Sequence, residues 1–206
     1  MNILLFSRIL EKTGVGNHIN QLSRELARQG HRVMVVSGTK NQDLDNDVAF
    51  KHLQTLSKNP LVIFKSIQQL HAIITQNKID VVHCHHRVAA LFMKLYNMLY
   101  PHVPTVYTLH SAPIPSDFFH RILTFPGDHT IGVSSDVSQF LTTALGVSSQ
   151  KVTTVLNGVN QEELFPLSND EKIALQEKFQ LTPDKTVLCT GQYLPVNRYC
   201  RSFWRR

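Results

Sequence analysis

The sequence of 206 residues is poor in cysteine, with Cys84, Cys189 and Cys200 scattered along the chain. Three isolated cysteines do not make the paired framework that stabilises small secreted domains, and such usage is typical of a reducing cytosol. The composition, 42% hydrophobic and 17% charged, is that of a chain that folds around a packed core. The sequence therefore excludes both a disulfide scaffold and a disordered chain.

Long apolar runs are also missing. The N-terminus is apolar only from Ile3 to Phe6 and has no basic residue ahead of this run, so a first buried strand explains it better than a signal peptide does. No run approaches the roughly 18 residues that span a bilayer. We therefore expect a cytoplasmic protein, with peripheral contact at the inner face of the membrane left open.

One segment is a candidate for such membrane contact. The predicted helix after His86 is basic and aromatic, and Phe118, Phe119 and Arg121 could extend its surface into a shallow patch. The alternative, an ordinary core helix with one solvated face, is favoured by the sequence.

The net charge of +6 gives little information about partners, because it is concentrated at one end of the chain. The last nine residues contain no acidic residue but four arginines: Arg198, Arg201, Arg205 and Arg206. Without these four, 17 basic residues face 15 acidic ones, a net charge of +2. We therefore expect no nucleic acid among the partners.

Strand and helix patterns alternate along the sequence. A strand at Asn2–Phe6 is followed by a glycine loop at Thr13–Asn17, a helix from about His18 to Arg28, and a second strand at His31–Ser37. Later strands are predicted at residues 48–53, 78–83, 105–109, 129–133, 151–156 and 186–190, with helices at 60–76, about 87–100, 117–124, about 135–145 and 170–180. This order predicts an α/β fold, a doubly wound, mostly parallel Rossmann-like sheet.

Ligands of such a sheet bind at the carboxyl ends of its strands. The clusters found at these ends are the glycine loop, Ser37-Gly38, His83–His86, His110-Ser111 and Ser134-Ser135. The glycine loop would place backbone N–H groups and a helix N-terminus where phosphate or another anion can bind.

The glycine loop lacks two features of a dinucleotide site. Its third glycine position is Ile19, and the second strand ends at Ser37-Gly38 without an acidic residue for the ribose. Both departures argue against the hypothesis that the chain is a nicotinamide- or flavin-dependent oxidoreductase. A tight turn without any ligand remains an alternative for Gly14 and Gly16.

The histidine cluster His83–His86 invites a metal-site interpretation. On a strand His83 and His85 share one face and Cys84 points away, and no second Cys/His cluster has a metal spacing. We predict no metal site, a buried and hydrogen-bonded His83, and His85 or His86 in the crevice. His110 could bond a hydroxyl or phosphate or orient a reacting group, or it could be a capped, satisfied histidine.

Five segments, in this order and spacing, resemble the N-terminal half of the family-four, GT-B-fold retaining glycosyltransferases: GVGNHINQLSRELARQGHRVMVVSG, IDVVHCHH, VYTLHSAP, IGVSSDVSQFL and VTTVLNGVNQEELFP. The resemblance implies a Rossmann-like acceptor domain, over residues 1–165, that faces a donor domain across a cleft. It implies transfer of a sugar from a nucleotide-sugar donor to a glycan or lipid-linked acceptor with retention at the anomeric carbon. It also implies no obligatory metal and no cofactor besides the nucleotide-sugar substrate.

The resemblance also assigns site residues by position. The loop with Gly14, Gly16 and Asn17 would approach the donor phosphates and the acceptor, and His110 would contact the donor sugar near the reacting centre. The strand ends add three expected substrate-binding residues: His85, Ser111 and Ser134.

The sequence departs from the family after the predicted strand at residues 186–190. Where the family has basic side chains that hold the donor diphosphate, this chain has Gln192 and Asn197. The ending from about residue 192 resembles nothing in the family, and we expect a truncated or frame-shifted terminus. Residues 166–206 would then be a linker and the first strand of an absent donor domain.

These observations leave three hypotheses. The leading one is a glycosyltransferase of cell-surface polysaccharide or lipopolysaccharide biosynthesis, weakly active or inactive as this chain alone. The second is a non-catalytic module that binds a glycan acceptor or pairs with a separate donor subunit. The third is a dinucleotide-dependent oxidoreductase, which the glycine loop already makes less favoured.

Overall fold

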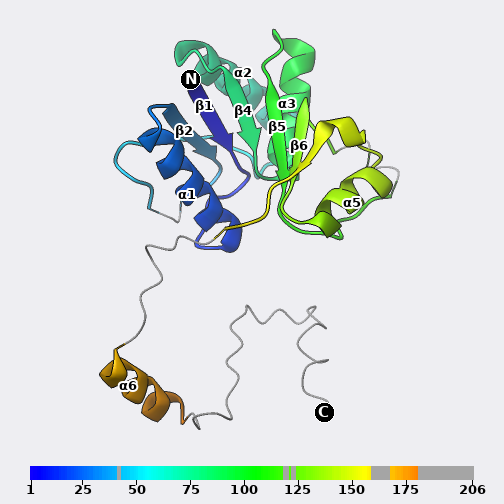
Figure 1. The fold of residues 1–206 in the computed structure, drawn as a ribbon. Coiled ribbons are helices and arrows are strands. Elements are labelled where there is room, and N and C mark those ends of the chain that lie inside the picture. Colours follow the sequence, from blue (N-terminus) through cyan, green and yellow to red (C-terminus); the bar gives the residue numbers. More distant parts are fainter. Residues whose placement is uncertain (41–42, 118–120, 122–123, 159–167, 181–206) are drawn as a thin grey trace. The chain divides into compact units, whose positions relative to one another are not determined.

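The computed structural model describes residues 1–40, 43–117, 121, 124–158 and 168–180 (Figure 1). The chain divides into two units, Met1–Gly158 and Val159–Arg206. The predicted domain boundary near residue 165, the predicted strand at 186–190 and the atypical ending lie outside the described residues, as does most of the predicted helix at 117–124.

The first unit is built on one sheet of seven parallel strands in the order β3-β2-β1-β4-β5-β6-β7. The strands are β1 (Asn2–Phe6), β2 (Arg32–Ser37), β3 (Ala49–His52), β4 (Val81–Cys84), β5 (Thr105–Leu109), β6 (His129–Gly132) and β7 (Val152–Thr154). The order reverses between β1 and β4, which pair with Ile3 beside Val81. This reversal is the topological switch point, outside which such sheets bind ligands.

Helices cover both faces of this sheet (Figure 1). They are α1 (Gly14–Arg28) on one face, and α2 (Pro60–Gln76), α3 (Arg87–Leu99) and α5 (Ser135–Thr143) on the other. Alternate side chains of β1 serve the two layers, since Leu5 packs with Ile19 of α1 while Phe6 meets Phe92 of α3 edge-on, with ring centroids 6.1 Å apart. The predicted doubly wound α/β fold is confirmed.

The first helix begins four residues earlier than predicted, so the expected glycine loop is its first turn. Thr13 is the N-cap: its Oγ1 accepts a hydrogen bond from Gly16 N at 3.3 Å, and its carbonyl accepts one from Asn17 N at 2.8 Å. Glycine disfavours a helix by about 0.5–1 kcal/mol per residue. Here the threonine cap and the apolar stripe that includes Ile19 offset that cost.

The fourth strand begins later than predicted. Residues 78–80 precede it as a turn, in which Lys78 has a left-handed φ of 49° and its N–H bonds the carbonyl of Thr75. This turn ends α2 and redirects the chain, so that the strand hydrogen bonds start at Val81.

The segment considered for membrane contact packs as a core helix. Phe92 and Tyr96 of α3 are buried, as the alternative for this segment predicted, and Phe118 and Phe119 lie outside the described residues. None of the described helices has the length and apolarity needed to cross a bilayer.

The second unit contains one described helix, α6 (Asn169–Phe179). It begins with a capping box, in which Ser168 and Glu171 each bond the backbone N–H of the other.

Candidate functional site

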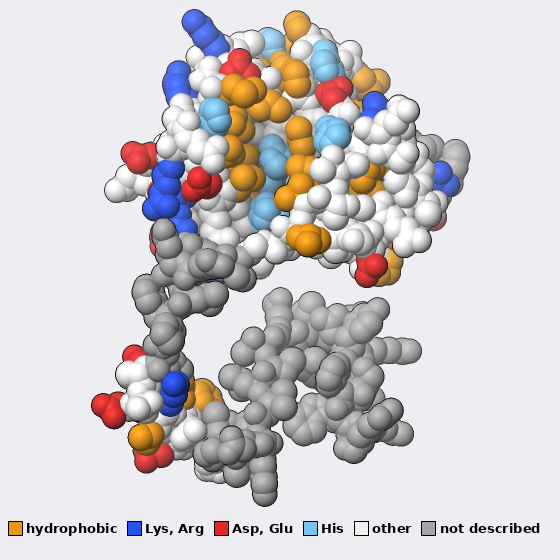
Figure 2. Space-filling view, viewed as in Figure 1, with side chains coloured by type: hydrophobic (Ala, Val, Ile, Leu, Met, Phe, Trp, Pro, Cys, Tyr) orange, Lys and Arg blue, Asp and Glu red, His pale blue; other side chains and the backbone are white. Residues whose placement is uncertain are grey.

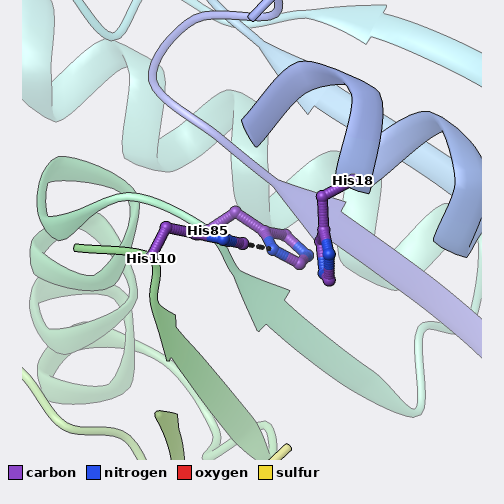
Figure 3. A group of neighbouring side chains, drawn as sticks. All are labelled: His18, His85 and His110. Carbon is purple, nitrogen blue, oxygen red and sulfur yellow. Dashed lines mark hydrogen bonds between the residues drawn. The ribbon is translucent and has the colours of Figure 1, made fainter. Parts of the chain in front are cut away.

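Three histidines from distant parts of the sequence meet at the carboxyl edge of the sheet (Figure 3). His18 lies on α1, which follows β1, while His85 follows β4 and His110 follows β5. One ring nitrogen of each lies within 4.8 Å of the others. The switch point between β1 and β4 produces this meeting, because it sets the start of α1 beside the ends of β4 and β5.

His85 is the buried centre of this group, which we call the histidine cluster (His18, His85 and His110). Its backbone N–H bonds the carbonyl of Phe6 at 2.8 Å, which extends the pairing of β1 and β4. Its ring is buried, and Nδ1 lies 3.2 Å from His110 Nε2, so one nitrogen donates a hydrogen bond to the other. His85 therefore fixes the orientation of the half-buried His110 ring.

The neighbours of His85 have structural roles. His83 is hydrogen-bonded as predicted, with Nε2 2.7 Å from Thr108 Oγ1, and its ring centroid is 4.1 Å from that of His85. His86 is the N-cap of α3, where Nδ1 accepts a hydrogen bond from Val88 N at 3.1 Å.

Burial lowers the pKa of each histidine here, and positive charge on the neighbouring rings would lower it further. The pKa of His83 falls to about 3, through burial and then His18 and His110. The pKa of His110 falls to about 4, through burial and then His18. The pKa of His85 lies well below its ordinary value, mainly because the ring is buried and then because of charge on the other three rings. Burial also lowers the pKa of His18.

All of these rings are therefore neutral at pH 7. A neutral imidazole offers one N–H donor and one lone-pair acceptor. The histidine cluster is thus suited to hydroxyl groups or to a metal ion, more than to the charge of a phosphate.

Two cavities meet at His110. The smaller, about 320 Å³, is lined by residues of the first two turns of α1, His18 among them, together with Asn157 and Gly158. The larger, about 390 Å³, extends over the ends of β4 and β5 and the loop after β5. Val15 and His110 line both, and each volume lies within the range of small-molecule sites.

One face of the first unit carries several histidine side chains (Figure 2). In Figure 2, histidine side chains lie between apolar side chains near the middle of this face.

A further cavity, of about 270 Å³, lies near the amino ends of β1 and β2. That is the edge opposite to the one where ligands of such sheets bind.

The start of α1 brings different chemistry to the smaller cavity. The first N–H groups of a helix, here those of Gly14 and Val15, have no intrahelical acceptor and carry the positive end of the helix dipole. A Cβ at Gly14 would meet nothing within 4 Å, so this glycine leaves the backbone open to the cavity. An anionic group fits this end of the site.

Five of the seven site residues predicted from the sequence line these cavities. They are Gly14 and Asn17 in the smaller cavity, His85 and Ser111 in the larger, and His110 in both.

The other two predicted residues line neither cavity. Gly16 is buried and its N–H is bonded to Thr13, and Ser134 is the N-cap of α5, where its Oγ accepts a hydrogen bond from Val137 N at 3.2 Å. Their substrate-binding roles remain predictions.

His18 is the residue that the sequence reasoning missed. It was placed at the start of the helix and given no function. With the helix starting at Gly14, positions 14 and 18 lie one turn apart on the same face. The threonine before the glycines was the signal that could have revealed this, because threonine is a favoured N-cap residue.

Comparison with known proteins shows a family match. The model of Glycosyltransferase Family 4 matches residues 12–163, a range that contains every predicted site residue. A glycogen synthase from Halalkalibacterium halodurans is 37% identical over 95 residues, which cover 42% of this chain and 20% of that protein.

Solved structures show the same fold at low sequence identity. A glycosyltransferase from Rickettsia africae ESF-5 matches with a TM-score of 0.72 at 20% identity, covering 89% of this chain and 50% of that one. Anabaena Alr3699/HepE, solved in complex with UDP and glucose, matches with a TM-score of 0.62 at 15% identity, covering 87% and 50%. The chain thus spans about half the length of these solved structures.

Proposed function

The chain belongs to glycosyltransferase family 4, and on this premise we propose that its first unit is the acceptor-side domain of a retaining glycosyltransferase. The reaction would transfer a sugar from a nucleotide-sugar donor to a glycan or lipid-linked acceptor. The observation that carries the proposal is the position of His110. Its neutral imidazole is held by His85 at the point where two cavities meet, at the carboxyl edge of the sheet beside the switch point.

His110 is placed to bind a sugar hydroxyl. Its Nε2 is bonded to His85, and its Nδ1 has no hydrogen-bond partner among the described residues. The lowered pKa keeps the ring neutral at pH 7, so Nδ1 would form a single hydrogen bond to a hydroxyl group. His85 acts through His110 and is a positioning residue.

The start of α1 would serve the phosphates. The N–H groups of Gly14 and Val15 and the helix dipole favour negative charge, which develops on the diphosphate as it leaves the sugar. Sugar and diphosphate would then lie on the two sides of His110. In this proposal the transfer uses no cofactor besides the donor.

The proposal extends to the pathway and the cellular location that were expected from the sequence. Transfer would serve cell-surface polysaccharide or lipopolysaccharide biosynthesis, in the cytoplasm or at the inner face of the membrane. An acceptor on a lipid carrier would fit that place.

Calorimetry of the 206-residue chain against UDP-, GDP- and ADP-sugars tests the proposal. We expect one of these donors to bind, and His110→Gln to weaken its binding roughly 3- to 10-fold, the equivalent of one hydrogen bond. His102→Gln is the matched control, since His102 is exposed and lies outside both cavities. Product analysis by NMR would report whether the anomeric configuration is retained.

Two outcomes would decide against the proposal or change it. Equal binding by the parent and His110→Gln would remove His110 from the donor site. A chain that binds oligosaccharide acceptors, but neither binds nor transfers any nucleotide sugar, would be the non-catalytic module instead.

A further inference from the structure

The first turn of α2 is apolar on every side. It reads PLVIF over Pro60–Phe64, an unbroken run of apolar residues. A helix that packs on a sheet can bury only one side of such a turn, and here Ile63 packs against the core. Leu61 is therefore left 72% exposed and Phe64 50% exposed.

Exposed apolar and basic side chains surround this turn. Leu61 and Phe64 are three residues apart, and exposed Lys65 follows Leu61 by four, so the three share the outer side of the helix. Leu56, 42% exposed, and exposed Lys58 lie in the loop that leads into α2. We call this surface the α2 patch (Leu56, Lys58, Leu61, Phe64 and Lys65).

Hydrogen bonds hold the α2 patch at the carboxyl edge of the sheet. Thr55 Oγ1 donates to the carbonyl of Arg8, just after β1, at 2.7 Å. Ser66 Oγ of α2 donates to the carbonyl of Gln54 at 2.9 Å, and this bond joins the loop to the helix. The α2 patch is therefore held at the same edge of the sheet as the two cavities at His110.

The charge around the α2 patch is of one sign. Between Val48 and Ile79 the chain has no acidic residue and four lysines: Lys51, Lys58, Lys65 and Lys78. Asp45, in the loop before this segment, lies 4.0 Å from Arg24 of α1, which covers the other face of the sheet. The positive end of the α2 dipole adds to the lysines, because no acidic residue occupies the first turn. The α2 patch therefore attracts anions.

Lysines beside exposed apolar side chains fit a lipid surface better than a protein. The cores of protein–protein interfaces are depleted in lysine. Helices that lie in a membrane interface instead combine leucine or phenylalanine on one side with basic residues that contact anionic lipids. The α2 patch has both parts, Leu61 and Phe64 beside Lys58 and Lys65.

We propose that the α2 patch docks the first unit on an anionic bilayer, with Leu61 and Phe64 inserted between the headgroups and Lys58 and Lys65 against the lipid phosphates. The inference rests on the proposed function for the cellular location, and it adds the surface and the charge of the lipid. Docking by this edge would bring the larger cavity toward the bilayer, where the head of a lipid-linked acceptor lies. This surface differs from the segment around α3 that the sequence suggested for membrane contact.

Vesicle sedimentation tests the proposal in the absence of donor and acceptor. The 206-residue chain is mixed with vesicles of phosphatidylcholine alone and with vesicles that also contain phosphatidylglycerol, an anionic lipid. We expect binding only to the anionic vesicles. Added salt should weaken this binding, because it screens the attraction between the lysines and the lipid phosphates.

Paired variants separate the apolar and basic parts of the α2 patch. The variant Leu61→Ser/Phe64→Ser should weaken binding to anionic vesicles roughly 10-fold or more, because less apolar surface enters the bilayer. The variant Lys58→Gln/Lys65→Gln should weaken binding roughly 10- to 30-fold, since each lysine near an anionic surface contributes about fivefold.

Two exposed residues at the opposite edge of the sheet supply matched controls. Met98 is 73% exposed near the end of α3, and Lys78 is exposed just after α2. Met98→Ser and Lys78→Gln should bind vesicles like the parent. Every variant keeps the four arginines of the last nine residues, so differences in binding report the α2 patch. Circular dichroism checks that each variant is folded.

Three results would overturn the proposal. The first is a parent chain that does not bind anionic vesicles, or that binds neutral ones equally well. The second is binding that both folded double variants of the α2 patch retain, which would assign it to other cations of the chain. The third is a parent dimer, detected by ultracentrifugation and lost in Leu61→Ser/Phe64→Ser, which would assign the α2 patch to a second copy.

The result is independent of the test of sugar transfer. Calorimetry of donor binding contains no lipid, and vesicle sedimentation contains no donor. Failure to bind vesicles would remove the membrane contact and leave donor binding at His110 as measured. Failure to bind any nucleotide sugar would remove the proposed transfer and leave the lipid-binding surface as measured.

Discussion

Acid should destabilise this domain through its buried and half-buried histidines, and the half-buried His83 provides the sharpest test. Its pKa is about 3 in the folded protein and 6.5 in the unfolded chain, where water surrounds the ring. Between these two values the unfolded chain binds a proton that the folded ring does not bind. The free energy of unfolding is therefore fully present above pH 6.5 and falls as the pH drops from 6.5 toward 3.

The size of the effect follows from the two pKa values. At pH 5.0 the unfolded ring is almost fully protonated and the folded ring is not, which favours unfolding by about 2 kcal/mol. Solvent reaches the partly buried ring, so we expect about 1–2 kcal/mol for His83. His85, His86 and His110 also have lowered pKa values, and together the loss is several kcal/mol. That is comparable with the total stability of a domain, about 5–15 kcal/mol.

Urea titrations at pH 7.5 and pH 5.0, with EDTA present to remove metal ions, measure this loss. For the parent chain the free energy of unfolding should fall between the two pH values. For His83→Gln, which can still bond Thr108, the fall should be smaller by about 1–2 kcal/mol. If His83→Gln loses as much stability as the parent, burial does not hold the His83 ring neutral and the argument fails.

Three further predictions concern other parts of the fold. In urea titrations, Gly132→Ala should lower the free energy of unfolding by about 1–3 kcal/mol, because the added Cβ would lie 2.9 Å from Ser138 N. Gly14→Ala should instead raise it by up to about 1 kcal/mol, because the space around that Cβ is open. Ser134→Ala should lower the free energy of unfolding by about 0.5–2 kcal/mol, because it removes the N-cap of α5. If stability is unchanged and nucleotide-sugar binding is weaker, the result would instead support the predicted substrate-binding role of Ser134. Cys84 should resist alkylation until urea unfolds the chain, as read by peptide mass spectrometry, since burial raises the pKa of its thiol.

The sequence predicts the elements well where a buried pattern has clear ends. The strand Thr105–Leu109 and the helix Pro60–Gln76 have the predicted bounds. Asn59 caps that helix, with its side chain accepting a hydrogen bond from Leu61 N, so a local signal marks the start. At Thr13 a cap and two glycines gave opposite signals, and the cap prevailed.

The site is predictable only in part, because its parts meet through tertiary structure. The rule that ligands bind at strand ends predicted His85 and His110, which lie 25 residues apart. His18 stands on a helix and not at a strand end, so that rule does not reach it. Its place depends on the direction in which α1 leaves β1, which the spacing of residues does not report.

The pairing of β1 with β4 also sets the order in which the chain can fold. β1 is synthesised first and can pair with β2 soon afterwards, but its other edge must wait until β3, α2 and β4 have been made. Until then the apolar strand Asn2–Phe6 presents an open edge that can pair wrongly with another chain. Such contacts between distant segments slow folding. The step that closes this edge also brings His18 to His85 and His110, so the ligand-binding edge is completed only when the sheet itself is complete.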